Sequence, residues 1–332
     1  MKEIIFVENT KNFNALRLGL RLAQYLQSEG HEVVLAGRKG KLPLHAGVRV
    51  CEFAPTAKTS TLATAFSKEK ANRVISFVCL QACEAAATAN LPYVYVEPEN
   101  YKEEKAVKNK ATILKNAKKV IVIGNSEKAL DKKRYGKNAV RVKNPAVCVE
   151  HNAWNKPVCF KKDNNIVASG KFAKNGGVDK LLSVWAKLAP AHTSWHLTIW
   201  GEGPSKGALR KFIAKHNLQN STEIVGTDTE LSSLLRAADV YVHPALQADD
   251  LDTVLDAMAS RLPVLASDIP AMQNYITQGL NGQLTPAGKE DAFCEALDGL
   301  LVDWGKRVGL AVEAEKMKNR FPFEIFASFL ED

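Results

Sequence analysis

Long hydrophobic runs are missing from this 332-residue sequence. No apolar run approaches the ~20 residues that a membrane-spanning helix needs, which excludes a helical membrane protein as a class. The opening segment MKEIIFVEN leads directly into an apolar run and lacks the regions of a secretory signal peptide. We therefore expect a cytoplasmic protein with enough residues for two domains, each with its own core.

Cysteine patterns that hold a metal are also missing. The six cysteines include no CxxC pair and show no metal-ligand spacing. Cys79 and Cys83 are four residues apart on an expected helix, where burial as small hydrophobic side chains explains them. The dinucleotide fingerprint GxGxxG does not follow the first expected strand. We expect no metal site, no bound cofactor and a reducing cytoplasm.

Acidic residues are scarce in the first half of the chain. Residues 1–160 contain 27 Lys and Arg against 14 Asp and Glu, whereas residues 161–332 contain 18 against 22. Residues 102–143 alone hold 14 basic and 4 acidic residues. This asymmetry predicts that the first half meets an anionic partner. A membrane surface, an anionic glycan and nucleic acid all fit, and a solvated lysine-rich face is the alternative.

Short apolar runs alternate with helical periodicity along the whole chain, which predicts parallel α/β sheets. The expected strands cover residues 3–8, 31–36, 74–78, 93–96, 120–123, 140–142, 165–169, 195–200, 223–225, 239–243 and 264–266. The expected helices lie within 12–30, 79–90, 108–117, 178–188, 206–216, 230–237, 253–260, 289–301 and 321–329. Residues 148–163 have no clear period and read as a linker. The pattern predicts two doubly wound Rossmann-like domains facing a cleft, a basic one over 1–155 and a second over 156–316.

The segment ADVYVHPALQADDLDTVLDAMASRLPVLASD, residues 238–268, predicts a strand, an acidic loop, a helix and a second strand. Such a unit presents its loop at the carboxyl edge of a parallel sheet, where ligands of open α/β sheets bind. Asp249, Asp250 and Asp252 precede or open the helix, and Asp256 lies inside it. Carboxylates accept hydrogen bonds from sugar or ribose hydroxyls. The alternative is an acidic first turn that only complements the helix dipole.

A glycine-containing loop follows the expected strand at residues 165–169. It reads GKFAKNGG and connects that strand to an amphipathic helix, so its backbone N–H groups and the helix dipole suit an anion. Lys171 and Lys174 add positive charge for a phosphate, although both could be ordinary solvated lysines. In the first domain, Asn9, Thr10 and Asn12 follow the first strand and occupy the corresponding loop.

Several segments together resemble one known family. These are NAKKVIVIGNSEKAL, GKFAKNGGVDKLLSVW, LTIWGEGPSKGALRKFI, TEIVGT, LLRAADVYVHPAL, DAMASRLPVLASD and GLNGQLTP. Their order and spacing are similar to those of retaining glycosyltransferases with the GT-B fold, the family of glycosyl transferases group 1. The resemblance covers most of residues 116–332, and the first 115 residues match only in outline.

The resemblance implies that the second domain binds a nucleotide-diphosphate sugar and the first binds the acceptor, with no metal required. A helix within 317–332 would cross back to the first domain. The implied donor-binding residues are Gly170, Lys171, Lys174, Thr227, Asp252, Thr253, Val254 and Asp256. The implied catalytic residues are Asp249, Asp250 and Lys171, and the acceptor-side residues are Asn9, Thr10 and Asn12.

The chain departs from the family pattern at several of these positions. Lys171 replaces an arginine, Gly176 replaces a second cation, and Ala248 replaces the first of two glutamates, while Asp256 replaces the second. We expect transfer with retention to a lipid-linked or cell-surface glycan, with the basic domain docked on an anionic membrane. Three alternatives stay open: a non-catalytic protein that binds a glycan or a partner, a glycosyltransferase acting on nucleic acid, and sugar-nucleotide epimerisation.

Overall fold

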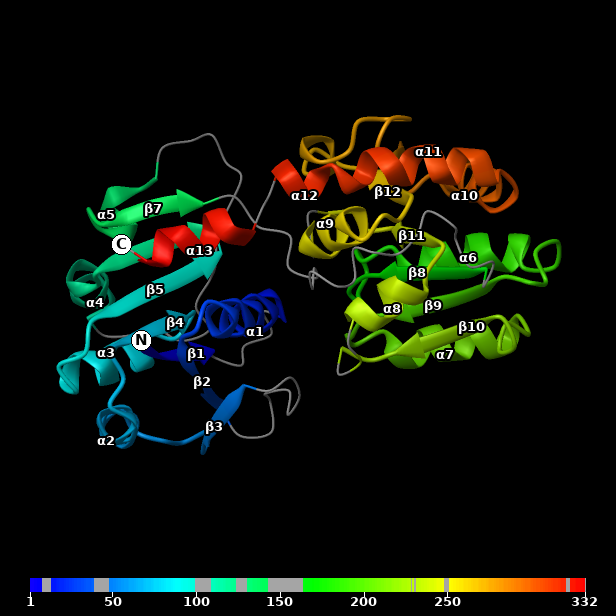
Figure 1. Cartoon of the computed structure of the whole chain (residues 1–332). Coiled ribbons are helices and arrows are strands. Elements are labelled where there is room, and N and C mark those ends of the chain that lie inside the picture. The colour runs from blue at the N-terminus through cyan, green and yellow to red at the C-terminus, as the bar shows by residue number, and fades with distance from the viewer. Residues whose placement is uncertain are drawn as a thin grey trace. The chain divides into compact units, whose positions relative to one another are not determined.

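The structure is a computed structural model, and it describes residues 1–7, 13–38, 48–98, 109–123, 130–142, 164–227, 229, 231–247, 251–320 and 323–331. The chain forms two compact units (Figure 1). Unit 1 contains Met1–Pro145 and Phe323–Asp332, and unit 2 contains Ala146–Pro322. The first division was expected after residue 155, ten residues after the observed limit at Pro145. The second was expected after residue 316, six residues before the observed limit at Pro322. The expected linker at 148–163 lies outside the described residues.

Unit 1 is built on a seven-stranded sheet in the order β3-β2-β1-β4-β5-β6-β7, and every described strand pair is parallel. Its strands are β1 Lys2–Val7, β2 Glu32–Arg38, β3 Arg49–Phe53, β4 Arg73–Phe77, β5 Tyr93–Pro98, β6 Lys119–Ile123 and β7 Ala139–Val142. Its helices are α1 Phe13–Ser28, α2 Thr59–Glu69, α3 Leu80–Thr88, α4 Lys110–Asn116, α5 Lys132–Tyr135 and α13 Phe323–Glu331.

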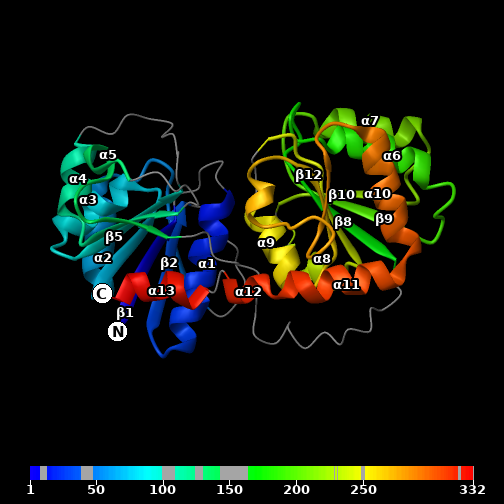
Figure 2. The same ribbon diagram turned by 90° about the horizontal axis from the view of Figure 1, so that it is seen from above.

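The two faces of this sheet are covered by different helices (Figure 2). Ile4 and Phe6 of β1 belong to the apolar cluster that α2, α3, α4 and α5 bury. Side chains alternate along a strand, so Ile5 and Val7 point to the opposite face. There they meet α1 at Gly19, where a Cβ atom would lie 2.5 Å from Val7 Cγ2. Continuous apolar strands are therefore buried on both faces, as a parallel sheet requires.

Helix α13 packs within unit 1, although it follows the whole of unit 2 (Ala146–Pro322) in the sequence. The Phe323 ring lies 5.7 Å from the ring of Tyr25 on α1. Lys119 Nζ donates to the carbonyl oxygen of Phe329 at 2.9 Å, and Arg73 Nη1 donates to that of Leu330. Two cations thus satisfy carbonyls at the helix C-terminus, where its dipole favours positive charge. The expected return of a C-terminal helix to the first domain is confirmed.

Unit 2 is built on a six-stranded parallel sheet in the order β10-β9-β8-β11-β12-β13. Its strands are β8 Asn165–Ser169, β9 His196–Trp200, β10 Thr222–Val225, β11 Val240–His243, β12 Val264–Asp268 and β13 Gln283–Pro286. Its helices are α6 Val178–Leu188, α7 Lys206–Lys215, α8 Leu231–Ala237, α9 Leu251–Ala259, α10 Glu290–Val302, α11 Trp304–Glu315 and α12 Met317–Arg320.

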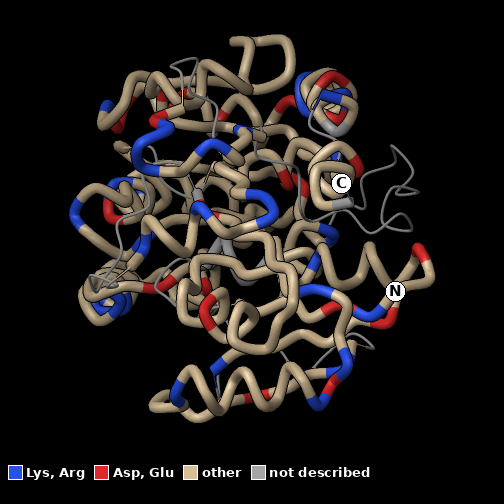
Figure 3. Tube along the Cα trace, turned by 90° about the vertical axis from the view of Figure 1, so that its left-hand side faces the viewer, with Lys and Arg blue, Asp and Glu red and all other residues tan. Residues whose placement is uncertain are grey.

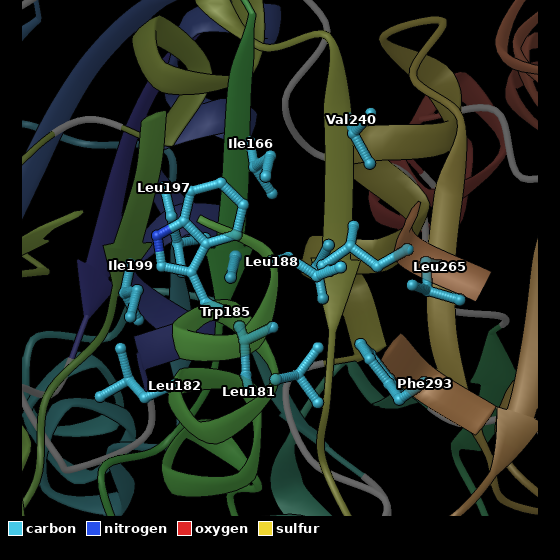
Figure 4. Packing of buried hydrophobic residues seen from close by; sticks show 14 of the residues in the cluster. Ile166, Leu181, Leu182, Trp185, Leu188, Leu197, Ile199, Val240, Leu265 and Phe293 are labelled. Carbon is cyan, nitrogen blue, oxygen red and sulfur yellow. The ribbon is translucent and has the colours of Figure 1, made fainter. Parts of the chain in front are cut away.

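The main core of unit 2 lies between the sheet and helices α6, α7 and α10 (Figure 4). Leu181, Leu182 and Trp185 form the apolar stripe of α6 and are almost completely buried. They pack against sheet residues such as Leu197 and Leu265. Helices α8 and α9 lie on the other face in Figure 2. The apolar side of α6 predicted from the sequence therefore faces the sheet. The prediction of two doubly wound domains is confirmed.

Some elements of the structure were not expected from the sequence. Strand β3 is a short edge strand in which only Phe53 is fully buried, so its residues show no apolar run. Helices α2 and α11 also lie in segments where no element was expected. Helix α11 contains Gly305 and Gly309, and it leaves Trp304 and Val312 exposed. Glycines and exposed apolar residues weaken the helical period that sequence analysis depends on.

Candidate functional site

The candidate site lies at the carboxyl edge of the sheet in unit 2. Strands β8 and β11 are far apart in sequence but pair directly, with Val242 opposite Ala168. Because both strands are parallel, the loops that follow Ser169 and His243 leave the sheet at the same edge. The glycine loop after β8 and the start of α9 after β11 are therefore neighbours, as the sequence analysis requires of a donor site.

The loop after β8 is held by backbone hydrogen bonds to the loops beside it. Phe172 N donates to the Glu202 carbonyl at 3.0 Å, and Ser205 N donates to the Phe172 carbonyl at 2.8 Å. On the other side, Leu246 N donates to the Asn175 carbonyl at 3.0 Å. These bonds join the loops that follow β8, β9 and β11 into one framework. Such a framework positions its N–H groups and side chains before any ligand arrives.

Two glycines permit the close packing of this framework. A Cβ atom on Gly176 would lie 1.8 Å from the Lys171 carbonyl oxygen. Gly177 has φ +71°, and a Cβ atom there would lie 1.9 Å from the Pro244 carbonyl oxygen. No side chain fits at either position with this backbone. The cation that the family pattern places at residue 176 therefore cannot stand there, and a charge for the same task must come from another residue.

Lys171 and Lys174 are the cations that the loop provides. Both side chains are exposed, and the loop leads into α6, which begins immediately after Gly177. The N-terminus of an α-helix has partial positive charge from its backbone N–H groups. Two lysines beside it form an arrangement that suits a phosphate or diphosphate.

A network of buried hydroxyl groups connects β8, β11 and α9. Tyr241 Oη donates to Thr253 Oγ1 at 2.7 Å, and Ser169 Oγ lies 2.5 Å from Tyr241 Oη and 2.9 Å from Thr253 Oγ1. His243 Nδ1 lies 3.4 Å from Ser169 Oγ. All four side chains have 0% exposure. The network fixes the first turn of α9 against the ends of both strands.

No role was predicted for Ser169, Tyr241 or His243 from the sequence. Ser169 and His243 are the last residues of β8 and β11, and Tyr241 is the second residue of β11. Polar groups in these mostly apolar strands are the one signal that could have identified them. Their contact depends on the pairing of β8 with β11, and this pairing cannot be read from a single strand. Thr253 was predicted to bind the donor, and its hydroxyl lies in this buried network.

The acidic residues assigned on α9 are buried. Asp252 is 1% exposed and Asp256 is 0% exposed, as is Val254 between them. Burial raises the pKa of Tyr275 to about 12, the negative charge of Asp252 adds to this rise, and Arg320 opposes it. Asp252 and Tyr275, both buried, therefore lie near each other and form a buried polar region of unit 2.

Of the remaining predicted site residues, some lie at the same edge of the sheet and others lie outside the described residues. Thr227 follows β10 at the same edge of the sheet and is half-buried. Asp249 and Asp250 lie outside the described residues, as does Ala248. The acceptor-side residues Asn9, Thr10 and Asn12 also lie outside them.

Among the described residues, no group of three or more His, Cys, Asp or Glu side chains could hold a metal ion. None of the helices described has the length and apolar character needed to cross a bilayer.

The curated proteins that are similar to part of this chain include glycosyltransferases. The phosphatidyl-myo-inositol mannosyltransferase of Mycolicibacterium smegmatis is 32% identical over 155 residues, which are 46% of this chain and 39% of that protein. An exopolysaccharide phosphotransferase of Streptomyces coelicolor is 27% identical over 171 residues, 50% of this chain and 18% of that protein. The matched regions thus cover less than half of either relative.

Solved structures match almost the whole chain in fold. A glycosyltransferase from Rickettsia africae has a TM-score of 0.70 at 14% identity and covers 99% of this chain and 97% of its own. Anabaena HepE in complex with UDP and glucose has a TM-score of 0.67 at 15% identity, with 99% and 98% covered. At these identities the likeness shows the fold alone, and that fold is GT-B.

The family comparison concerns the residues that form the candidate site. The model of the family described as glycosyl transferases group 1 matches residues 151–317. This span is half of the chain, and it includes the glycine loop, the buried hydroxyl network and α9. The chain belongs to the glycosyl transferases group 1 family.

Proposed function

We propose that this protein transfers a sugar from a nucleotide-diphosphate sugar to a glycan or lipid-linked acceptor. One observation carries the proposal. The rigid glycine loop with exposed Lys171 and Lys174 lies beside the start of α9, at one carboxyl edge of a parallel sheet. A diphosphate needs fixed positive charge and N–H donors, and this edge offers both.

Comparisons support a nucleotide sugar as the donor. HepE, which shares the fold, has been solved in complex with UDP-glucose. The relatives include proteins named as a phosphatidyl-myo-inositol mannosyltransferase and an α-D-kanosaminyltransferase. Hexosyl transfer is the form of the reaction that these names favour.

In the proposed reaction, unit 2 stabilises the leaving group. The bond between the anomeric carbon of the sugar and the diphosphate breaks, and negative charge develops on the departing diphosphate. The acceptor hydroxyl oxygen forms the new bond to the anomeric carbon, and its proton passes to the departing diphosphate. Lys171, Lys174 and the N-termini of α6 and α9 would stabilise that charge. Asp249 or Asp250 would accept hydrogen bonds from the sugar hydroxyls. Transfer would retain the anomeric configuration and would need no metal ion.

Asp256 is the proposed acceptor for the ribose hydroxyls, and its burial adds a condition. A carboxylate with 0% exposure can reach a ribose only if the residues that cover it move or the ligand replaces part of this cover. A comparison of ribonucleotides with 2′-deoxyribonucleotides tests this role directly. If Asp256 binds the ribose, Asp256→Asn should reduce the preference for the ribonucleotide, whereas Lys171→Ala should weaken both ligands equally.

The proposed acceptor binds to unit 1, at the loop that contains Asn9, Thr10 and Asn12. The positive charge of the first half of the chain supports an anionic environment for that acceptor. A lipid-linked glycan at the cytoplasmic face of a membrane provides such an environment, and the protein would then be peripheral on that surface.

Thermal unfolding with a panel of ligands tests the proposal. The full chain would be heated with UDP, GDP, ADP, CMP and their common sugar conjugates. A ligand at ~100 times its dissociation constant adds about 2.7 kcal/mol of stability, which corresponds to a shift of several degrees. A selective shift with one nucleoside diphosphate and its sugar is the expected result.

The panel also separates the proposal from a non-catalytic role. A shift with one nucleotide sugar, followed by release of the free nucleotide when an acceptor is added, supports transfer. A shift without any turnover in a crude membrane-lipid acceptor mixture would favour a binding protein. The absence of a shift with every nucleotide would contradict the donor site.

A further inference from the structure

The strongest observation outside the donor site is an exposed apolar face on helix α11 of unit 2. We propose that this face binds the same face of a second copy of the chain, with the two helices antiparallel about a twofold axis. It is called here the α11 face, and it consists of Gly305, Val308, Gly309 and Val312. None of these residues belongs to the proposed donor site, so the inference does not depend on the proposed function.

The α11 face points away from the core of unit 2. Gly305, Gly309 and Val312 are exposed, and Val308 is half-buried. The buried residues of α11 lie on the other side of the helix and are Arg307, Leu310, Ala311 and Ala314. Six large hydrophobic side chains are exposed among the residues that the structure describes, and three of them lie on α11 or just before it: Val302, Trp304 and Val312. Single exposed apolar residues are common, whereas such a group indicates an interface.

Helix α7 shows what a solvated helix of this chain exposes. Lys and Arg segments and Asp and Glu segments, drawn in blue and red, recur along the chain in Figure 3. On α7 the exposed side chains include Arg210, Lys211 and Lys215. The α11 face contains no charged residue and exposes two glycines and a valine instead. Depletion of charge is typical of the central part of a protein interface.

The two glycines of the α11 face leave space that one copy of the chain does not use. A Cβ atom on Gly309 would meet nothing within 4 Å, and the nearest atom to a Cβ atom on Gly305 would be Asp303 Oδ1 at 3.4 Å. Glycine inside a helix is less favourable than alanine. The packing of one copy therefore does not explain the glycines, whereas the close approach of a second helix backbone does.

Charge complementarity selects a second copy as the partner. Lys306 and Glu313 are seven residues apart, close to two helical turns, so both flank the α11 face on the same side. In an antiparallel pair centred near Gly309, Lys306 of each copy lies opposite Glu313 of the other. The twofold axis makes this contact twice. A parallel pair would place Lys306 against Lys306, so the charges favour the antiparallel arrangement.

Both flanking charges can take part in such a contact. Lys306 is half-buried, and its ammonium makes no ion pair with the residues that the structure describes. Glu313 is also half-buried, and its Oε1 lies 2.6 Å from Lys316 Nζ of the same chain. A carboxylate has two oxygens and accepts from a second ammonium as well. Exposed ion pairs contribute little affinity, so the apolar contact stabilises the dimer and the charges set its register.

Sedimentation velocity of the full chain tests the proposal. A single pair of helices gives a small interface, so we expect a reversible dimer with a dissociation constant roughly in the micromolar range. The chain should therefore be mostly dimeric at about 100 μM and mostly monomeric at about 0.1 μM. A chain that stays monomeric at about 100 μM would overturn the proposal.

A matched pair of glycine variants locates the interface. Gly309→Gln places a long side chain where the two helices cross and should weaken the dimer by more than about thirtyfold. Gly207→Gln on α7 is the control, because a Cβ atom at either position meets nothing within 4 Å. This control should dimerise within about twofold of wild type. Both variants should melt at or above the wild-type temperature, since glutamine favours a helix over glycine. Equal dissociation constants would overturn the assignment to α11.

A charge-reversal cycle tests whether the partner is a second copy. Lys306→Glu or Glu313→Lys alone places like charges at both symmetric contacts and should weaken the dimer about tenfold. The double variant has opposite charges at both contacts again, so its dissociation constant should return to within about threefold of wild type. A double variant as weak as the single variants would overturn the antiparallel pairing.

The dimer and the donor site can fail separately. Gly309→Gln should keep the nucleotide-dependent thermal shift of the wild-type chain, because its substitution lies outside the donor site. A dimer that forms in a chain without any nucleotide-dependent shift would contradict the donor proposal and support this one. A monomeric chain with the expected shift would do the reverse.

Discussion

Strand β1 of unit 1 and strand β8 of unit 2 occupy matching places in their sheets. Strand β1 lies between β2, the next strand in sequence, and the later strand β4. Strand β8 likewise lies between β9, the next strand in sequence, and the later strand β11. The segments after β4 and β11 therefore correspond. After β4 comes α3, whose buried residues are all apolar, whereas α9 after β11 buries Asp252, Thr253 and Asp256.

The buried residues of α3 are apolar, whereas those of α9 include carboxylates, and this difference distinguishes residues that the fold requires from residues that a binding site requires. Helix α3 shows that this topology accepts an apolar helix at this place. A buried carboxylate needs partners for its charge, whereas the apolar residues of α3 need none, so packing alone does not explain the acidic α9. Buried polar groups of this kind are expected where function requires them. Unit 1 provides the reference against which the polar edge of unit 2 can be tested.

The largest effect should come from closing the space that the glycine loop uses. Gly177→Ala introduces a Cβ atom 1.9 Å from the Pro244 carbonyl oxygen and places alanine at φ +71°. Left-handed backbone costs roughly 1–2 kcal/mol and overpacking roughly 1–3 kcal/mol. We expect unit 2 to lose roughly 2–5 kcal/mol of unfolding free energy, measured by urea unfolding.

All five tryptophans lie between residues 154 and 304, so tryptophan fluorescence reports unit 2 specifically. Gly207→Ala is the matched control, because a Cβ atom there meets nothing within 4 Å. Alanine also favours a helix over glycine by roughly 0.5–1 kcal/mol. Similar stability for Gly177→Ala and Gly207→Ala would contradict the tightly packed loop.

The sheets could be predicted from the sequence because parallel strands buried on both faces leave continuous apolar runs. EIIFV and NIVAS are such runs, and β1 and β8 fall within a residue or two of the expected positions. Strand β3 could not be found in this way. Its position at the edge exposes Arg49 and Glu52, so no burial pattern marks it.

Alkaline pH should distinguish the buried polar region of unit 2. Burial raises the pKa of Tyr275 from its ordinary value near 10 to about 12. Between these values the unfolded chain loses the tyrosine proton while the folded chain keeps it. The free energy of unfolding therefore falls as pH rises from 10 towards 12, by roughly 1.4 kcal/mol per pH unit.

Tyr275→Phe removes this titration. The free energy of unfolding of this variant should therefore fall less than that of the wild type between pH 10 and 12, as measured by tryptophan fluorescence. Burial also raises the pKa of Tyr93 in unit 1 to about 12, which makes Tyr93→Phe the matched variant. It should leave the tryptophan-detected pH dependence unchanged. An equal effect of the two variants would show that the units do not unfold separately.

A smaller effect is expected from removing the exposed charge of the loop. Lys171→Ala should weaken nucleoside diphosphate binding about tenfold, because a charge-assisted contact to phosphate is worth at least about 1.5 kcal/mol. Titration calorimetry measures the dissociation constant, and Lys211→Ala on the exposed face of α7 is the control. Unchanged affinity in Lys171→Ala would remove this residue from the site. Both variants should melt near the wild-type temperature, since exposed side chains contribute little to stability.

The composition of the candidate site was only partly accessible from the sequence. Lys171 and Lys174 could be identified because a glycine loop between a strand and a helix is a local pattern. The hydroxyl network of Ser169, Tyr241 and Thr253 depends on the pairing of β8 with β11, which joins residues 72 positions apart. Likewise, the exclusion of any side chain at Gly176 follows from the position of a carbonyl oxygen and has no sequence signal.

The smallest effect should come from removing a single buried tyrosine hydroxyl of unit 2, with a matched hydroxyl of unit 1 for comparison. In unit 1, Tyr95 Oη donates to the buried carboxylate of Glu97 at 3.0 Å. In unit 2, Tyr241 Oη bonds to Thr253 and Ser169, and those two hydroxyls also lie 2.9 Å from each other. They can therefore keep one partner when Tyr241 is replaced, whereas Glu97 loses a donor to a charge.

We expect Tyr95→Phe to destabilise unit 1 by about 2 kcal/mol and Tyr241→Phe to destabilise unit 2 by about 1 kcal/mol. Hydrogen–deuterium exchange resolves the two sheets in one experiment, because β5 and β11 give separate peptides. Faster exchange should be confined to the unit that carries the substitution. A larger loss for Tyr241→Phe than for Tyr95→Phe would mean that the hydroxyl network contributes as a unit, and that the polar edge of unit 2 stabilises the fold as well as preparing a site.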